Sequence, residues 1–203
     1  MVLRATPQKR EEKERVRRAL LRAALELGAA HGFASLGLRE VSRAADIAPT
    51  SFYRQFSEMP ELGQALVDEL VGPLLDELAK TGAENVSLGL TEGMLHAVRA
   101  DPELVRFLVA ERSGAFAPLR KAIASKLDVL ARTLRERVLS RGRDTKEVDQ
   151  ASEQAASDTL VALVLDGFTR LLEESDEQRE RQRERLLGSL AHVLGPYPDA
   201  RRK

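Results

Sequence analysis

Residues 32–56 read GFASLGLREVSRAADIAPTSFYRQF, and this stretch decides the fold. Residues 38–45 carry apolar side chains at helical spacing and predict a helix of two turns, with a glycine before it as the N-cap. Residues 46–48 predict a tight turn. Pro49 suits the first position of a second helix that runs through residue 56. Two short helices joined by a three-residue turn indicate a helix-turn-helix.

The second of these helices is the candidate DNA reader. In a helix-turn-helix it lies in the major groove, with its N-terminal residues against base edges. Thr50 and Ser51 have short hydroxyl side chains, and Tyr53 and Arg54 can bond phosphate or guanine. The two phenylalanines of the segment, four residues apart, should face inward and anchor the helix. The alternative is a helical hairpin whose polar residues face water.

The charge distribution is compatible with DNA binding and equally with a solvated first helix. The whole chain carries 32 Lys and Arg against 32 Asp and Glu, which excludes a uniformly basic coat protein for nucleic acid. Residues 1–56, however, hold 11 basic and 6 acidic residues, and the remainder holds 21 and 26. A positive head on a negative body indicates that the head meets a polyanion. A solvated first helix is the alternative, because three glutamates lie among its basic residues.

Composition limits the class of protein. The 203 residues are 43% hydrophobic, 32% charged and 4% aromatic, which is typical of a folded helical chain of one or two domains. The absence of Cys excludes disulfides and Cys-ligated zinc. The sequence has no run of about 18 apolar residues, so it predicts no membrane span, and no secretory signal is visible. We expect a cytoplasmic protein without membrane contact.

Helical periodicity extends along most of the chain, and we find no strand alternation or repeat. A kink or break is expected at Gly72-Pro73, and the charge run over residues 173–185 predicts a solvated helix face. We expect two domains, a DNA-binding head over 1–57 and a body over 58–203. The expected helices cover residues 9–31, 38–45, 49–56, 60–70, 88–98, 101–109, 119–138, 147–172 and 186–194.

Enzymatic interpretations find no support in the residues. His31, His96 and His192 are far apart, and none belongs to a helical metal-binding pair. The glycines form no phosphate loop or dinucleotide fingerprint, and no nucleophile elbow is present. We therefore expect no catalytic residues, no metal site, no cofactor and no enzyme.

The segment resembles the TetR family of transcriptional regulators. The resemblance rests on Gly32-Phe33, Leu38-Arg39-Glu40-Val41, Ala44-Ala45, Phe52-Tyr53-Arg54-Gln55-Phe56 and Glu61-Leu62. Within the family, this stretch and the tetrapeptide ERSG at 111–114 are similar to the FabR/DesT type of repressors of unsaturated fatty acid synthesis.

The resemblance implies an all-α fold: a three-helix DNA-binding head, then a helical body that binds a ligand and forms the dimer. It implies that Thr50, Ser51 and Arg54 face the groove and that Tyr53 bonds a phosphate. Arg39 would lie near the DNA backbone, and Pro49 opens the reading helix. The chain departs from the family pattern at Gly37 (commonly Thr or Ser), Asp46 (Gly), Gln55 (His) and Met59 (Lys).

Met and Phe side chains of the body suit an adaptable apolar tunnel, although each can equally be ordinary core. An arginine could meet an anionic head group such as the phosphates of coenzyme A. The resemblance implies a long-chain acyl thioester, such as acyl-CoA, as the effector. The candidate ligand residues are Met94, Leu95, Phe107, Leu108, Arg112, Phe116, Leu127, Val164 and Phe168.

The helix over residues 160–172 is apolar nearly all round and must be covered on all faces. A second subunit could cover it, or a larger core within one chain could do so. We expect a homodimer, because two reading helices must lie one or more DNA turns apart on a palindromic operator. The candidate interface residues are Val161, Leu165, Phe168, Leu187, Leu190, Ala191 and Leu194.

The resulting hypothesis is a repressor of fatty acid genes whose effector changes the spacing of the two heads. There are two alternatives. The first is a regulator of the same type that responds to another small hydrophobic ligand. The second is a helical protein-interaction scaffold that does not bind DNA.

Overall fold

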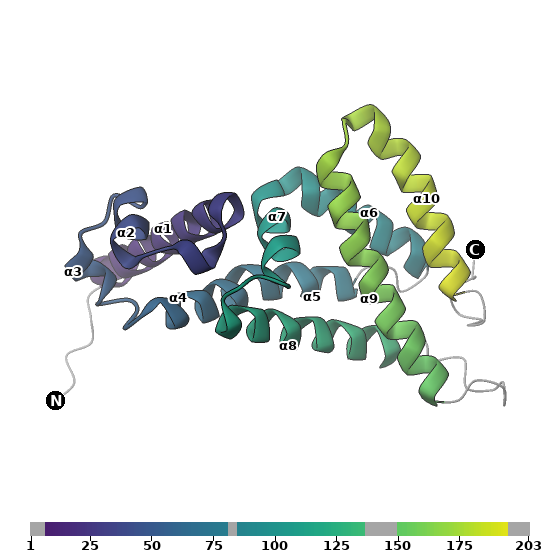
Figure 1. The fold of residues 1–203 in the computed structure, drawn as a ribbon, viewed down its shortest axis with the longest axis horizontal. Coiled ribbons are helices and arrows are strands. Elements are labelled where there is room, and N and C mark those ends of the chain that lie inside the picture. The colour runs from purple at the N-terminus through teal and green to yellow at the C-terminus, as the bar shows by residue number, and fades with distance from the viewer. Residues whose placement is uncertain (1–6, 81–84, 137–149, 195–203) are drawn as a thin grey trace.

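The computed structural model describes residues 7–80, 85–136 and 150–194, and these residues are almost entirely helical, as expected. The molecule is elongated, with α1–α3 at one end and α9 and α10 at the other (Figure 1). The helices are α1 (Pro7–His31), α2 (Leu38–Ala44), α3 (Pro49–Phe52), α4 (Met59–Leu66), α5 (Gly72–Lys80), α6 (Val86–Ala100), α7 (Pro102–Glu111), α8 (Ala117–Leu134), α9 (Gln150–Glu173) and α10 (Asp176–Leu194). Two short segments, the 3-10 turn η1 (Phe33–Ser35) and the π-helical turn η2 (Val67–Val71), complete the order.

The head consists of α1, η1, α2 and α3. Helix α1 ends before Gly32, whose φ of 80° is a left-handed conformation that glycine adopts without strain. The helical spacing of residues 9–31 predicts one apolar face with Val16, Leu20, Ala23, Leu27 and Ala30, but Ala30 is exposed. The buried arc is wider than that face, since Leu21 and Leu25 are also buried. The reason is that α1 packs against α2 and η1 on one side and against α4 and α7 on another.

The helix that follows the head runs from α4 through η2 into α5. The expected break at Gly72-Pro73 is replaced by a π-helical turn, in which Gly72 N–H donates to Val67 O five residues back. Pro73 has no N–H to donate, so a locally widened turn absorbs the loss and the helix continues. This helix therefore connects the head to the body without an interruption (Figure 1).

The remaining body helices enclose α9. Asp101 is the N-cap of α7, as predicted, and its Oδ1 accepts the Leu104 N–H at 3.1 Å. The nearly all-apolar second half of α9 is covered by α6, α7, α8 and α10 of the same chain. Residues 173–194 form mainly a single helix, α10, so the predicted charge run and the apolar end that follows it belong to one element.

Phe33 joins the head to the body. Its ring is 1% exposed and lies 6.4 Å from the Phe107 ring, edge to face, and 5.3 Å from the Phe116 ring. Gly28 and Gly63 let these rings approach, since a Cβ there would lie 2.7 Å from Phe107 and 3.2 Å from Phe33. Phe33 therefore fills part of the core, and the core of the head continues into that of the body.

A buried carboxylate secures the same joint. Glu111, at the end of α7, is 3% exposed, and its Oε1 accepts the Phe33 N–H at 2.8 Å. Its Oε2 has no hydrogen-bond partner. A Cβ at Gly114 would lie 2.3 Å from that oxygen, so glycine is the residue that leaves room for the carboxylate.

Candidate DNA-binding surface and apolar cavity

The reading segment begins where Pro49 opens α3. The preceding Ala48 has extended backbone angles (φ −61°, ψ 140°), and its carbonyl accepts the N–H groups of Ser51 and Phe52. The α-helix ends at Phe52, and a turn bonded from Phe56 N–H to Phe52 O carries the chain to Phe56. As expected, Phe52 and Phe56 face inward, fully buried, with ring centroids 5.7 Å apart.

The predicted DNA contacts lie on the opposite side of this segment. Arg39, Pro49, Thr50, Tyr53 and Arg54 are exposed, and Ser51 is half-buried. Tyr53 is 63% exposed, and its ring leans edge-on against Phe52. The contact with Phe52 restricts the ring, which lowers the entropy cost of ordering the phenol against a phosphate. Contact of these six residues with DNA stays a prediction.

The turn between α2 and α3 sets the direction of the reading segment. Asp46 has φ 53°, a left-handed conformation that Asp tolerates better than most residues with a Cβ. Its N–H donates to Arg43 O, and the Ile47 N–H donates to Ser42 O, which together form a Schellman motif at the end of α2. The departure from the glycine of the family pattern is therefore accommodated in the expected geometry.

Helix α1 holds the back of the reading segment. The Arg17 guanidinium lies over the Phe56 ring, 4.6 Å from its centroid, and its Nε donates to Glu69 of η2 at 2.8 Å. Gln55 donates to the Lys13 carbonyl at 3.1 Å, so the residue that replaces the family's histidine serves the joint with α1. Sequence reasoning missed Arg17, because nothing distinguishes it within the basic run of the first helix.

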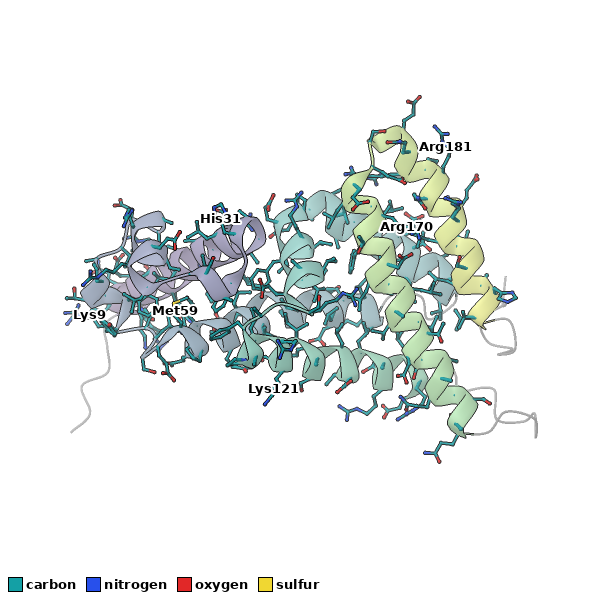
Figure 2. All side chains as sticks on the ribbon, viewed as in Figure 1. Lys9, His31, Met59, Lys121, Arg170 and Arg181 are labelled. Atoms are coloured by element: carbon teal, nitrogen blue, oxygen red, sulfur yellow. The ribbon has the colours of Figure 1, made fainter. Side chains whose placement is uncertain are left out.

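Several basic side chains of the head are free to meet an anion. Arg39, Arg43 and Arg54 are exposed and form no ion pair with any described residue. On α1, by contrast, Arg15 pairs with Glu12 at 2.8 Å, which reduces its contribution. Figure 2 shows Lys9 at the outer end of the head, far from the charged side chains Arg170 and Arg181 of α9 and α10.

A cavity of about 720 Å³ lies between the η2–α5 segment and α6, and the start of α7 borders it. This volume falls within the range of small-molecule sites. Its apolar wall consists of Leu70, Pro73, Leu74, Leu78, Ala97, Leu104 and Val105. Its charged groups are carboxylates, from Glu69, Glu77, Glu92 and Asp101, and His96 is also in the lining.

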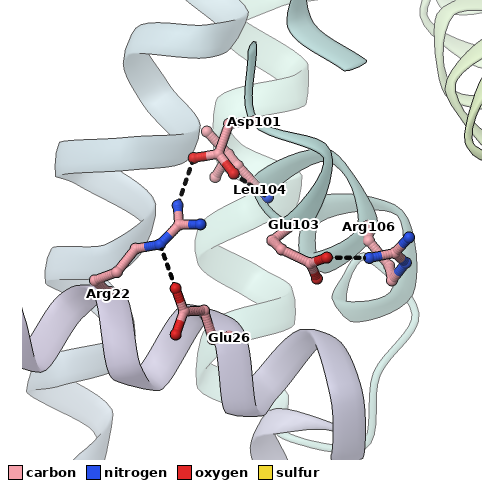
Figure 3. A network of polar contacts seen from close by, with 6 residues as sticks. All are labelled: Arg22, Glu26, Asp101, Glu103, Leu104 and Arg106. Atoms are coloured by element: carbon pink, nitrogen blue, oxygen red, sulfur yellow. Dashed lines mark hydrogen bonds and ion pairs between the residues drawn. The ribbon is translucent and has the colours of Figure 1, made fainter. Parts of the chain in front are cut away.

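Two of these carboxylates are bonded to arginines of the head. Asp101 Oδ2 accepts from Arg22 Nη1 of α1 at 2.6 Å, and Arg22 also bonds Glu26 at 2.7 Å (Figure 3). Burial lowers the pKa of Arg22, but the hydrogen bonds to Glu26 and Asp101 outweigh it, so the pKa is raised. Glu69 bonds Arg17, as described above. The cavity wall and the head therefore share two ion pairs.

The nine predicted ligand residues line none of this cavity. Phe116 and Leu127 are half-buried, and Arg112 is exposed. The face of α6 that lines the cavity carries Gly89, Gly93 and Ala97. These residues are small, and the sequence prediction selected large apolar side chains. The other six are buried in the core: Met94, Leu95, Phe107, Leu108, Val164 and Phe168.

The predicted dimer residues differ in how much of each side chain is exposed. Phe168, Leu190 and Leu194 are fully buried within one chain, so their side chains have no surface for a partner. Val161 and Leu165 are 8% and 5% exposed, Leu187 is half-buried, and Ala191 is exposed. The apolar character of α9 is explained by packing within the chain, and dimerisation stays a prediction.

The described residues contain no group of three or more His, Asp or Glu arranged to hold a metal ion. None of the described helices is long and apolar enough to cross a membrane.

A protein-family model matches the N-terminal part of the chain, and solved structures match most of its length. Residues 20–66 match the family model of bacterial regulatory proteins, tetR family. A tetR-family transcriptional regulator from Streptomyces coelicolor is 18% identical, with a TM-score of 0.68 over 90% of this chain and 82% of that chain. The fatty acid degradation regulator FadR from Bacillus halodurans is 21% identical, with a TM-score of 0.64 over 85% and 98%.

A proposed fatty acid metabolism regulator from Clostridium perfringens is 11% identical, with a TM-score of 0.69 over 87% of this chain and 97% of that chain. At these identities the structures show the fold and not the ligand. The chain therefore has the fold of TetR-type regulators, and its residues 20–66 match the sequence pattern of bacterial regulatory proteins of the tetR family.

Proposed function

We propose that this protein is a transcription regulator that binds duplex DNA through the head and a small hydrophobic effector in the body. The observation that carries the proposal is the reading segment. Two buried phenylalanines hold it, and Thr50, Tyr53 and Arg54 are exposed. Arg39 and Arg43 of the neighbouring α2 form no ion pair with the residues that the structure describes. The match of residues 20–66 to the tetR family supports it.

The regulator acts as a homodimer on a palindromic operator. One reading segment covers about half a DNA turn, and a twofold pair places two segments about 34–36 Å apart or at a multiple of that distance. The effector seats in the cavity between η2–α5 and α6. Its binding changes DNA affinity because the cavity wall is bonded to the head through Arg17 and Arg22.

A long-chain acyl thioester that controls fatty acid genes is the finer form of this proposal. It is supported by the resemblance of residues 33–56 and by two structural neighbours whose names mention fatty acid regulators. A repressor role follows from the same resemblance. The acyl chain would occupy the apolar wall of the cavity, and the thioester head group would extend beyond it.

The test of the DNA proposal is a binding titration by fluorescence anisotropy, first with random duplexes to select an operator and then at several salt concentrations. We expect affinity to fall steeply with salt, since arginines displace counterions. Tyr53→Ala and Arg54→Ala should each weaken operator binding by about 1–3 kcal/mol. Arg132→Ala, on the exposed face of α8, is the matched control and should bind as the parent does.

If both head variants bind the operator as tightly as the parent does, the reading segment does not contact DNA. If the protein binds no duplex at any salt concentration, the protein-interaction scaffold replaces DNA binding as the interpretation.

A further inference from the structure

We propose that the cavity takes an apolar amine or quaternary ammonium compound, whose cationic centre competes with the head's arginines for Glu69 and Asp101. This inference rests on the proposed function, because it assigns a ligand class to the effector cavity. It favours a lipophilic cation over the acyl thioester considered above.

The first ground is the charge of the cavity. The residues that line it include four carboxylates, from Glu69, Glu77, Glu92 and Asp101, and no described lysine or arginine. Each of these carboxylates is paired with an arginine or lysine that does not line the cavity: Glu69 with Arg17, Glu77 with Lys80, Glu92 with Arg183 and Asp101 with Arg22. A carboxylate or phosphate on the ligand would therefore find no cationic donor in the lining itself. A cation finds several acceptors of opposite charge.

The second ground is the shape and apolar character of the wall. Leu70, Leu74, Leu78, Leu104 and Val105 line the space between η2–α5 and the α6–α7 corner. A ligand that carries both an alkyl or ring portion and a cationic centre satisfies both parts of the lining. A compact hydrophilic cation such as a metal ion does not use the apolar wall.

The third ground is that two of the carboxylates are shared with the head. Asp101 uses Oδ1 for the Leu104 N–H and Oδ2 for Arg22, at 3.1 and 2.6 Å. Glu69 Oε1 accepts from Arg17, which also covers the Phe56 ring of the reading segment. A ligand cation that bonds these oxygens must share them with Arg22 or Arg17.

The competition gives the ligand different affinities for two arrangements of the head. When Arg17 and Arg22 are bonded, the carboxylates are less available; when the head moves away, they are free. Differential affinity of this kind is what allows a ligand to shift DNA binding. By contrast, Glu92 pairs with Arg183 of α10 and Glu77 pairs with Lys80, and neither partner belongs to the head.

The test compares three probes with one chain length on the full-length protein: decyltrimethylammonium, decanol and decanoate. Isothermal titration should show at least tenfold tighter binding of the ammonium than of the other two. Glu69→Gln and Asp101→Asn should each reduce that preference at least threefold, and Asn retains the capping oxygen for α7. Asp128→Asn, an exposed carboxylate on α8, is the control and should leave it unchanged.

Competition itself is tested by Arg22→Gln, which removes one competitor and should tighten decyltrimethylammonium binding at least twofold. Binding of decanoate or decanol as tight as the ammonium, no binding of any probe, or unchanged preference in both carboxylate variants would overturn the ligand class. Weaker or equal binding in Arg22→Gln would overturn the competition. Operator binding is measured separately, so its failure reports on the proposed function and not on this inference.

Discussion

The substitution Gly114→Ala tests the joint between head and body. The new Cβ would lie 2.3 Å from Glu111 Oε2 and 3.0 Å from Glu111 Cδ, so the carboxylate must move. It cannot move freely, because it is 3% exposed and its other oxygen accepts the Phe33 N–H at 2.8 Å. Displacing it breaks that hydrogen bond inside the protein.

Hydrogen bonds to charged groups contribute about 1.5–3 kcal/mol. We therefore expect Gly114→Ala to lower the free energy of unfolding by about 2 kcal/mol, which corresponds to a Tm lower by roughly 4–8 °C for a chain of this length. Urea unfolding followed by circular dichroism measures the change as a shifted midpoint with an unchanged slope. Gly188→Ala, at an exposed position inside α10, is the control: a Cβ there meets nothing within 4 Å, and alanine favours a helix over glycine, so stability should not fall.

A double-mutant cycle decides whether the clash with the carboxylate is the cause. In a Glu111→Ala background, the two side-chain atoms closest to the new Cβ are removed, and the nearest remaining one of the three close atoms is the backbone Cα of residue 111, at 3.2 Å. The added cost of Gly114→Ala should then fall below about 0.5 kcal/mol. Equal cost in both backgrounds would refute the reasoning, because it would place the strain elsewhere than at the carboxylate.

Two further predictions concern a turn and an ion pair. Asp46→Ala should destabilise the protein by about 1 kcal/mol and Asp46→Gly should not, because φ 53° favours glycine over alanine; equal urea midpoints would contradict this. Hydrogen bonds from Lys126 and then Gln64 lower the pKa of Asp68 below its ordinary value of 3.8. Its contribution is therefore present above pH 3.8 and is lost as the pH falls through the folded value. Asp68→Asn should be less stable at pH 7 by under about 1 kcal/mol, since the pair is exposed, and the gap should shrink in thermal melts as the pH falls below 3.8; a constant gap would contradict the sign.

Local rules predicted the helix-turn-helix well. The end of the first helix at residue 31, the proline at the start of α3 and the inward pair Phe52 and Phe56 each depend on a few neighbouring residues. Their geometry follows from backbone conformation and helical spacing, which the sequence displays directly.

Features that depend on distant residues were not predictable in the same way. Arg17 pairs with a residue 52 positions away, and no local pattern marks that contact. The cavity arises where glycines and alanines of α6 leave space opposite η2–α5, so it is a property of helix spacing. The apolar second half of α9 was compatible with a partner subunit or with a larger core in one chain, and the contacts of α10 with α9 show that much of the cover comes from within the chain.

The Phe33 joint bears on how such a regulator can be recombined with others. A chimera cut after residue 57 would carry a phenylalanine selected for the pocket between Phe107 and Phe116 into a foreign body. The recipient would also lack a carboxylate placed to receive the Phe33 amide. Exchange of operator specificity between relatives therefore requires that residues 107–116 travel with the head, although they lie far beyond it along the chain.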